Sequence, residues 1–361
     1  MVYVKSCHVV DSRIRRGAHA PAEHGAPPSF ELQAIPAAAS ATGHVSYQYP
    51  EPDPRAVPDK KQTGKTFIPH DPHHTGMPQV RSIAQVLTAR QTMEGAGVRL
   101  HRAFGYDELP LFDPFLMLDD FRAKNPHDYL PGFPWHPHRG IETVTYMLDG
   151  RVEHGDSMGN TGEINAGDVQ WMTAGSGIIH QEMPKPVDGR MGGFQLWVNL
   201  PRAHKMHKPR YQEVKRVQIP AVEPQAGVSI RIICGKVAGV QGPVRDIVAD
   251  PEYLDITLAA DSEYTHPVKT GYTAAAYVIG GAGAFGQAAG DRMGNRSMLL
   301  FSAGDEVRVQ SSGEGVRFLF ISGRPIHEPI AWGGPIVMNT QEELRQAFFE
   351  YRNGTFIRTR A

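Results

Sequence analysis

From residue 81 onward the chain alternates short apolar runs with turn-forming residues, a pattern that favours β-strands over helices. The runs are rich in Val, Ile, Leu, Tyr and Phe, and Gly, Pro, Asp and Asn separate them. Strands are expected at residues 81–91, 115–121, 142–148, 168–173, 194–199, 229–234, 254–258, 274–279, 297–301, 306–309 and 317–321. Many short strands with regular turns are typical of a sandwich or a barrel, so an all-β fold is predicted.

One segment near the C-terminus has a helical pattern instead. Thr340 and Glu343 have the spacing of a capping box at the start of residues 340–352. The apolar residues Leu344, Ala347, Phe348 and Tyr351 fall on one face of this helix. We expect it to dock on the β-structure through that face.

The chain repeats part of its own pattern. Three pairs of segments resemble each other in the same order: 143–150 with 274–281, 164–171 with 301–308, and 193–199 with 317–323. The first pair places Tyr146 over Tyr277 at an offset of 131 residues. Common β-turn chemistry explains any one of these echoes but not their shared order, so a duplicated barrel is predicted.

Residues 1–80 differ from the rest. They hold 11 of the 29 prolines and no sustained helical or strand period. Such a stretch buries too little apolar surface to offset the entropy of ordering it. A disordered N-terminal extension is expected here.

Composition narrows the possible functions. A formal net charge of −1, with no helix-turn-helix pattern, argues against direct nucleic-acid binding. No apolar run approaches the roughly 18 residues that cross a bilayer. With two cysteines and no secretory pattern, a cytoplasmic location is expected, or a nuclear one in a eukaryote.

Two pairs of polar residues have the spacing of ligands on strands. His136 and His138 are two positions apart, as are His180 and Glu182, so each pair projects to one face of its strand. Two such strands side by side would offer three imidazoles and a carboxylate. That set suits a divalent first-row transition metal with vacant positions.

The second repeat lacks these residues. At the offset of 131, His136 corresponds to Pro267 and His138 to Lys269. A barrel unit that keeps its framework without the histidines indicates that the fold does not require them.

Five segments together resemble the pirin family of bicupins over residues 81–355. They are 113–121 (DPFLMLDDF), 136–150 (HPHRGIETVTYMLDG), 167–184 (GDVQWMTAGSGIIHQEMP), 194–200 (FQLWVNL) and 334–344 (GPIVMNTQEEL). The resemblance implies two tandem cupin barrels, which are double-stranded β-helices of the jelly-roll type, followed by the C-terminal helix. The expected divisions are 1–80 for the extension, 81–205 for a metal-binding cupin, 206–340 for a cupin without ligands, and 341–361 for the helix and tail.

The resemblance also implies a metal site. Pirins hold a single iron through three His and one Glu, which by motif correspond to His136, His138, His180 and Glu182. Fe(II) is therefore expected, although these ligand types also accept Ni, Cu, Mn and Zn. The general cupin pattern offers Glu142 as an alternative carboxylate, and by strand parity it would share the face of the two histidines.

Two functions are compatible with the resemblance. Some pirins have quercetin 2,3-dioxygenase activity, which implies cleavage of a small aromatic substrate by O2, with Glu182 as the catalytic base. Phe133 and Met172, with Trp135, Met147 and Met183 nearby, are candidates for an apolar substrate pocket, although core packing explains them equally well. The alternative is a non-enzymatic, redox-responsive iron protein whose partner is a transcription factor or a metabolic enzyme.

Overall fold

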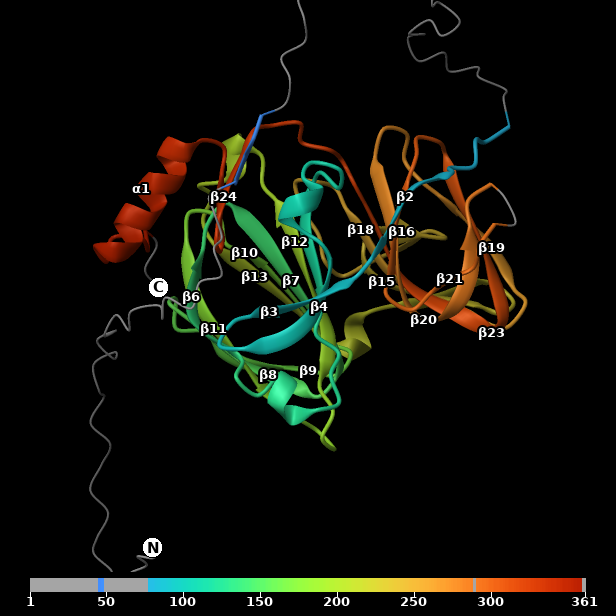
Figure 1. The fold of residues 1–361 in the computed structure, drawn as a ribbon, viewed down its shortest axis with the longest axis horizontal. Coiled ribbons are helices and arrows are strands. Elements are labelled where there is room, and N and C mark those ends of the chain that lie inside the picture. The colour runs from blue at the N-terminus through green and yellow to red at the C-terminus, as the bar shows by residue number, and fades with distance from the viewer. Residues whose placement is uncertain (1–44, 49–76, 288–289, 359–361) are drawn as a thin grey trace, which may run out of the picture. The chain divides into compact units, whose positions relative to one another are not determined.

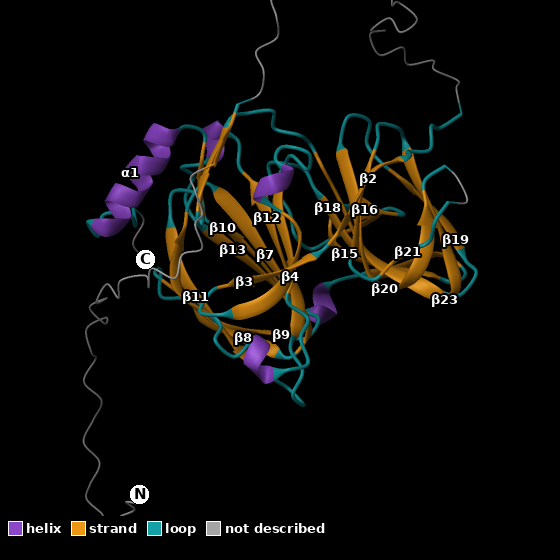
Figure 2. Ribbon diagram, in the orientation of Figure 1, coloured by secondary structure: helices purple, strands orange, loops and turns teal. Residues whose placement is uncertain are grey.

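The computed structural model describes residues 45–48, 77–287 and 290–358 (Figure 1). Strands dominate it, and α1 (Gln341–Arg352) is the one α-helix of the described residues. The other short helices in Figure 2 are 3-10 turns of three residues each. The predicted all-β fold of two barrels with a C-terminal helix is confirmed. No helix in the described ranges is long and apolar enough to cross a membrane.

Two sheets build the first barrel. A seven-stranded sheet has the order β13-β10-β7-β12-β5-β4-β3, and a four-stranded sheet has the order β6-β11-β8-β9. Their strands are β3 (Arg90–Glu94), β4 (Val98–Phe104), β5 (Phe115–Asp120), β6 (Phe133–His138), β7 (Ile141–Asp149), β8 (Arg151–Asp156), β9 (Thr161–Asn165), β10 (Val169–Thr173), β11 (Ile178–Lys185), β12 (Gly192–Asn199) and β13 (Arg210–Val214). Apolar residues from both sheets, including Leu100, Met147 and Ile164, fill the space between them.

A nine-stranded sheet forms the second barrel, with the order β14-β15-β18-β23-β20-β22-β2 and with β19 and β21 beside β23 and β20. Its strands are β2 (Ile83–Thr88), β14 (Ala221–Gln225), β15 (Val228–Cys234), β18 (Glu252–Leu258), β19 (Glu263–Pro267), β20 (Thr273–Phe285), β21 (Met293–Gly294), β22 (Ser297–Phe301) and β23 (Glu306–Gly323). A small hairpin joins β16 (Lys236–Val237) to β17 (Val240–Gln241). The core of the second barrel contains Ile256, Val278 and Phe318, which come from β18, β20 and β23.

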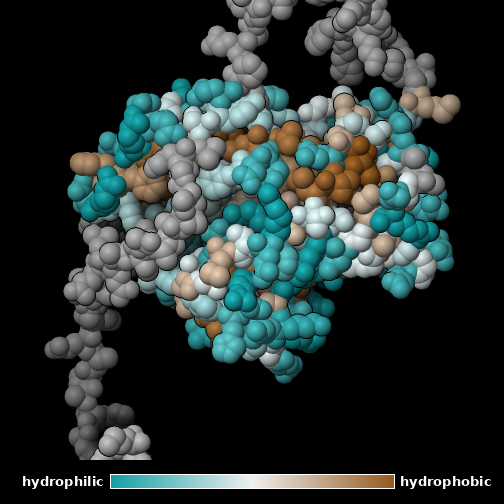
Figure 3. All heavy atoms as spheres, in the orientation of Figure 1, coloured by the Kyte–Doolittle hydropathy of each residue, from teal (hydrophilic) through white to brown (hydrophobic). Residues whose placement is uncertain are grey.

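The strand predicted at 81–91 is two strands that belong to different barrels. β2 pairs with β22 of the second barrel, and β3 pairs with β4 of the first. The break falls at Ala89, which is buried among residues of both barrels. The expected first cupin of residues 81–205 therefore begins with a strand, β2, that pairs in the second barrel. β2 is an edge strand of its sheet, and its Val86 side chain is exposed. Figure 3 shows apolar residues gathered over β2 and β18.

The end of the chain returns to the first barrel. β24 (Ile330–Gly333) and β25 (Ile336–Met338), which lie within the predicted second cupin, form a separate sheet with β1 (Val45–Tyr47). Trp332 and Val337 of this sheet pack against Ile141 and Trp197 of the first barrel. The prediction of a wholly disordered extension is thus wrong at β1, and residues 1–44 and 49–76 lie outside the described residues.

Helix α1 has the predicted capping box, because Thr340 accepts from the Glu343 backbone N–H and Glu343 bonds back to the Thr340 N–H. Leu344 and Ala347 are buried against β24 and β25, as the one-sided pattern predicted. Arg139, next to the histidine pair, donates to the Glu350 carboxylate of the helix. The helix therefore docks beside the predicted site.

The two barrels meet through the sheets that contain the repeated tyrosines. Tyr146 donates to Asp255 of the second barrel at 2.6 Å, and Tyr277 donates to Asp120 of the first at 2.9 Å. These reciprocal bonds lie within one continuous core that includes Phe194. The predicted correspondence of Tyr146 with Tyr277 is confirmed by their equivalent places on β7 and β20.

The echo of residues 164–171 in residues 301–308, both of which contain Ala-Gly-Asp, does not mark equivalent strands. Asp168 precedes β10, which pairs with β7, whereas Asp305 precedes the first half of β23, which pairs with β19. The strand equivalent to β10 is β22, because it pairs with β20. Shared turn chemistry explains this echo, and the alignment drawn from it was wrong.

Candidate metal centre

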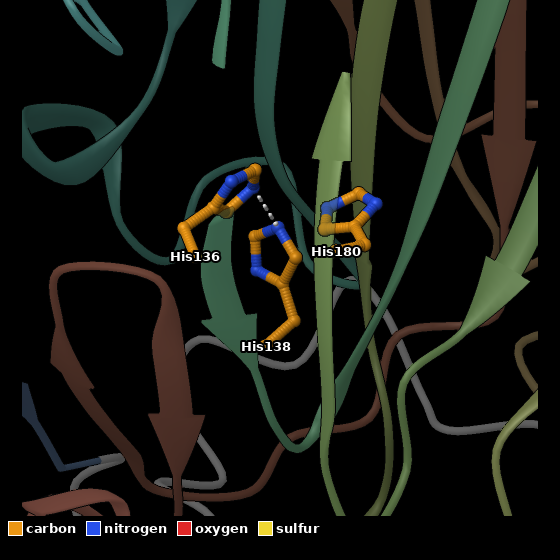
Figure 4. A group of neighbouring side chains, drawn as sticks. All are labelled: His136, His138 and His180. Carbon is orange, nitrogen blue, oxygen red and sulfur yellow. Dashed lines mark hydrogen bonds between the residues drawn. The ribbon is translucent and has the colours of Figure 1, made fainter. Parts of the chain in front are cut away.

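The two histidine-bearing strands are neighbours. β6 pairs antiparallel with β11, and His136 lies directly opposite His180 in this register. The imidazoles of His136, His138 and His180 point toward one another in Figure 4, and one potential ligand atom from each lies within 4.8 Å of the others. The predicted convergence of the three histidines is thereby observed.

Backbone carbonyls orient two of the rings. Nδ1 of His136 lies 2.8 Å from the Pro134 oxygen, and Nδ1 of His138 lies 2.9 Å from the Pro335 oxygen. A carbonyl only accepts, so each Nδ1 carries the proton and each Nε2 presents a lone pair. The two Nε2 atoms are 3.1 Å apart, so two hydrogen-bond acceptors face each other. A cation bound to both nitrogens would remove the repulsion between their lone pairs.

Of the three histidines, His180 has the fewest hydrogen bonds to its ring nitrogens among the described residues. It is 1% exposed, and neither of its nitrogens has a hydrogen-bond partner among the described residues. Burial, together with the neighbouring imidazoles, lowers the pKa of His138 and His180 well below 6.5, and burial lowers the pKa of His136. The neutral imidazoles that result are the form that binds metal, so these residues fit a divalent transition metal.

Glu182 lies beside the three histidines but outside their group. The register of β11 shifts between His180 and Glu182, which places Glu182 opposite Phe133. Its buried carboxylate accepts from the Thr145 hydroxyl at 2.8 Å and from the Gln195 amide at 3.1 Å. A role as the fourth ligand therefore stays a prediction.

The alternative carboxylate, Glu142, faces away from the site. The chain turns through Gly140, at φ +78°, between β6 and β7, so strand parity does not carry across from His138. Glu142 shares a face of β7 with Val144, which packs toward the second barrel, and it accepts from Thr173 at 2.6 Å. The interpretation of Glu142 as a ligand is wrong for this reason.

A mostly apolar cavity of about 30 Å³ adjoins Glu182. Its polar lining comes from Asp119, Thr145, Glu182 and Gln195, and its apolar lining includes Phe133, Phe121, Leu100 and Met191. Phe133 thus lines this cavity, and its role in a substrate pocket stays a prediction. Met172 is not among the lining residues and packs instead with Ala174 and Ile178.

Sequence reasoning missed several neighbours of the site. His154 lies across from Glu182 on β8, with its ring centre 5.5 Å from that of His180, and it hydrogen bonds with Tyr211. His154 and Asp156 are two positions apart, so their spacing could have indicated that both project to one face of a strand. Lys205 and the Pro335 carbonyl gave none, because their positions depend on contacts between distant parts of the chain.

The second barrel holds an inward histidine that the offset of 131 did not reveal. His266, rather than Pro267, points into the core, where it is 3% exposed. It hydrogen bonds with Tyr264 at 3.2 Å and with Glu252 at 3.3 Å. Within the described ranges, the only cluster of three potential metal ligands is the one in the first barrel.

Two barrels of this topology, with a three-histidine group in the first, define a bicupin with one candidate metal centre. The Pirin model matches residues 97–198, and the Pirin C-terminal cupin domain model matches residues 253–357. The chain belongs to the pirin family.

Individual relatives agree with this assignment. The chain is 45% identical over 278 residues to a pirin-like protein of Caulobacter vibrioides, covering 77% of this chain and 99% of the relative. It is 42% identical over 283 residues to a Pseudomonas aeruginosa protein provisionally named quercetin 2,3-dioxygenase, covering 77% and 99%. A crystal structure titled quercetin 2,3-dioxygenase from Acinetobacter baumannii matches with a TM-score of 0.70 and 32% identity, covering 76% and 98%.

Proposed function

We propose that this protein is a metal-dependent dioxygenase that cleaves a flavonol such as quercetin with O2. The observation that carries the proposal is the convergence of three neutral imidazoles, two buried and one half-buried, near a cavity that Glu182 lines. His136, His138 and His180 would hold the metal, with Glu182 as the fourth ligand and Fe(II) as the proposed ion. When bound, such a metal supplies a Lewis acid with vacant positions for substrate and O2.

Glu182 is the proposed base for the flavonol hydroxyl. A general base must be held in position near the proton that it accepts. The hydrogen bonds from Thr145 and Gln195 hold the Glu182 carboxylate in one orientation. Phe133 offers an apolar surface to the aromatic rings from the same cavity wall. In this proposal Thr145 and Gln195 orient the carboxylate, Glu182 accepts the proton, and Phe133 contacts the aromatic rings.

One observation favours the second candidate, a non-enzymatic iron protein that responds to redox state and binds a protein partner. A cavity of about 30 Å³ holds one or two water molecules, which is far less than a flavonol requires. Turnover therefore requires the cavity to widen around the substrate, whereas metal binding alone does not.

The two candidates are separated by reconstituting the full chain with Fe(II), then with Ni, Cu, Mn and Zn in turn, and adding quercetin. Loss of flavonol absorbance with matching O2 uptake is expected for the enzyme. His136→Ala and Glu182→Gln should abolish turnover, whereas His127→Ala, at an exposed site, should not change it. One equivalent of bound metal without turnover by any of these ions would contradict the enzyme and favour the second candidate.

A further inference from the structure

The segment that joins β24 to β25 lies against the turn that follows the histidine pair. The Pro335 carbonyl accepts from Nδ1 of His138, a residue 197 positions earlier in the chain. Ile336 forms a parallel bridge with Arg139, and the Val337 N–H donates to the Arg139 carbonyl at 3.1 Å. We call residues 334–337 the return segment.

Little space separates the return segment from this turn. A Cβ atom placed on Gly140 would lie 2.0 Å from the Val337 carbonyl oxygen, so the two backbones meet in direct contact. A shift of the return segment would therefore move the Pro335 carbonyl, which orients His138. A shift toward Gly140 would also displace the turn.

Lys205 links the return segment to the turn. Its ammonium group is buried and donates to the Gly140 carbonyl at 2.9 Å, the Val337 carbonyl at 3.0 Å and the Asn199 side-chain oxygen at 2.8 Å. These bonds use all three of its donors. All three acceptors are neutral, and burying an ammonium without a carboxylate partner costs stability. The arrangement is thus a specific clamp rather than an ordinary ion pair.

We propose that Lys205 and the return segment are positioning elements of the metal centre, so that metal affinity is coupled to docking of the return segment. The inference rests on the proposed metal site. Lys205 fixes the turn and the return segment together, and the return segment then fixes the ring direction of His138 through Pro335. Residues that orient metal ligands typically change affinity by about 10–100-fold when they are replaced.

The first test compares Lys205→Met with Lys208→Met in the full chain. Lys208 is an exposed lysine of the same segment, which makes it a matched control. We expect Lys205→Met to bind Co(II) about 10-fold or more weakly in chelator competition and to change the visible spectrum of the Co(II) protein, with Lys208→Met unchanged. A folded Lys205→Met protein with the affinity and spectrum of Lys208→Met would overturn the inference.

A second test uses the unmodified protein, so it does not depend on the variant folding. Coupling is reciprocal, so Co(II) should slow amide hydrogen exchange in the return segment, above all at the Val337 N–H. Peptides from β15 in the second barrel should not change. Equal exchange at Val337 with and without Co(II) would also refute the coupling.

His138→Ala separates failure of this inference from failure of the proposed site. If His138→Ala binds Co(II) as the unmodified protein does, the metal site itself is wrong. If His138→Ala loses Co(II) while Lys205→Met retains it fully, the site stands and the positioning role does not.

Discussion

Replacing His180 with leucine should make the metal-free protein more stable. Both ring nitrogens of His180 are buried without hydrogen-bond partners in the described structure. Each such group costs about 1–3 kcal/mol of folding free energy, so the ring costs about 2–6 kcal/mol. A volume-conserving change in a packed site costs less than about 1.5 kcal/mol. Subtracting that cost leaves an expected gain of about 0.5–4.5 kcal/mol for His180→Leu.

The assay is thermal unfolding of chelator-treated protein, with and without added Co(II). The entropy of unfolding is about 2.1 cal/mol/K per residue, so in a chain of 361 residues a gain of 1 kcal/mol raises Tm by about 1–2 °C. A rise of about 1–6 °C is therefore expected for His180→Leu. Metal at 100 times its Kd should stabilise the unmodified protein by about 2.7 kcal/mol and His180→Leu not at all. His127→Leu, at an exposed position, is the control. A metal-free His180→Leu protein with a Tm below that of the unmodified protein would show that these nitrogens carry no such cost.

Three further outcomes follow from the same structure. Tyr146→Phe and Tyr277→Phe should each cost about 1.5–3 kcal/mol, measured by denaturant unfolding, because each removes a buried bond to an aspartate of the other barrel; a loss below 0.5 kcal/mol in both would contradict this. Burial raises the pKa of the Cys234 thiol to about 12, so Cys234 should not react with a disulfide reagent at pH 8 until the protein unfolds, and labelling of Cys234 in the native state would refute it. The pKa values of His138 and His180 lie below 6.5 when folded, so the unfolded chain binds more protons and the metal-free protein should lose stability as pH falls from 7 toward 5; a Tm that is constant over this range would exclude that linkage.

Local spacing predicted the histidine pairs because alternate residues of any strand share a face, whatever the rest of the fold does. It predicted the α1 cap for the same reason. The predictions failed where the outcome depended on backbone irregularity. A turn at Gly140 reversed the parity expected for Glu142, and a register shift in β11 separated Glu182 from His180. Neither irregularity has a signature in the order of apolar and polar residues.

Contacts between distant segments were equally inaccessible. β2 joins the second barrel although its neighbour β3 joins the first, and the return segment reaches His138 across 197 residues. Such pairings are selected by the packing of complete sheets. A sequence pattern describes one strand at a time, so it gives the face of a residue but not the partner across from it.

The two barrels show why burial of a histidine alone does not identify a site. His266 and His180 are both almost fully buried on inward faces of equivalent sheets. His266 bonds with Tyr264 and Glu252, so its ring is satisfied by the fold. His180 has no hydrogen-bond partner within the part of the chain that the structure describes, and it faces two imidazoles whose potential ligand nitrogens also converge. A core that retains such an uncompensated group is less stable than it could be, and a bound cation is the ligand that removes that cost.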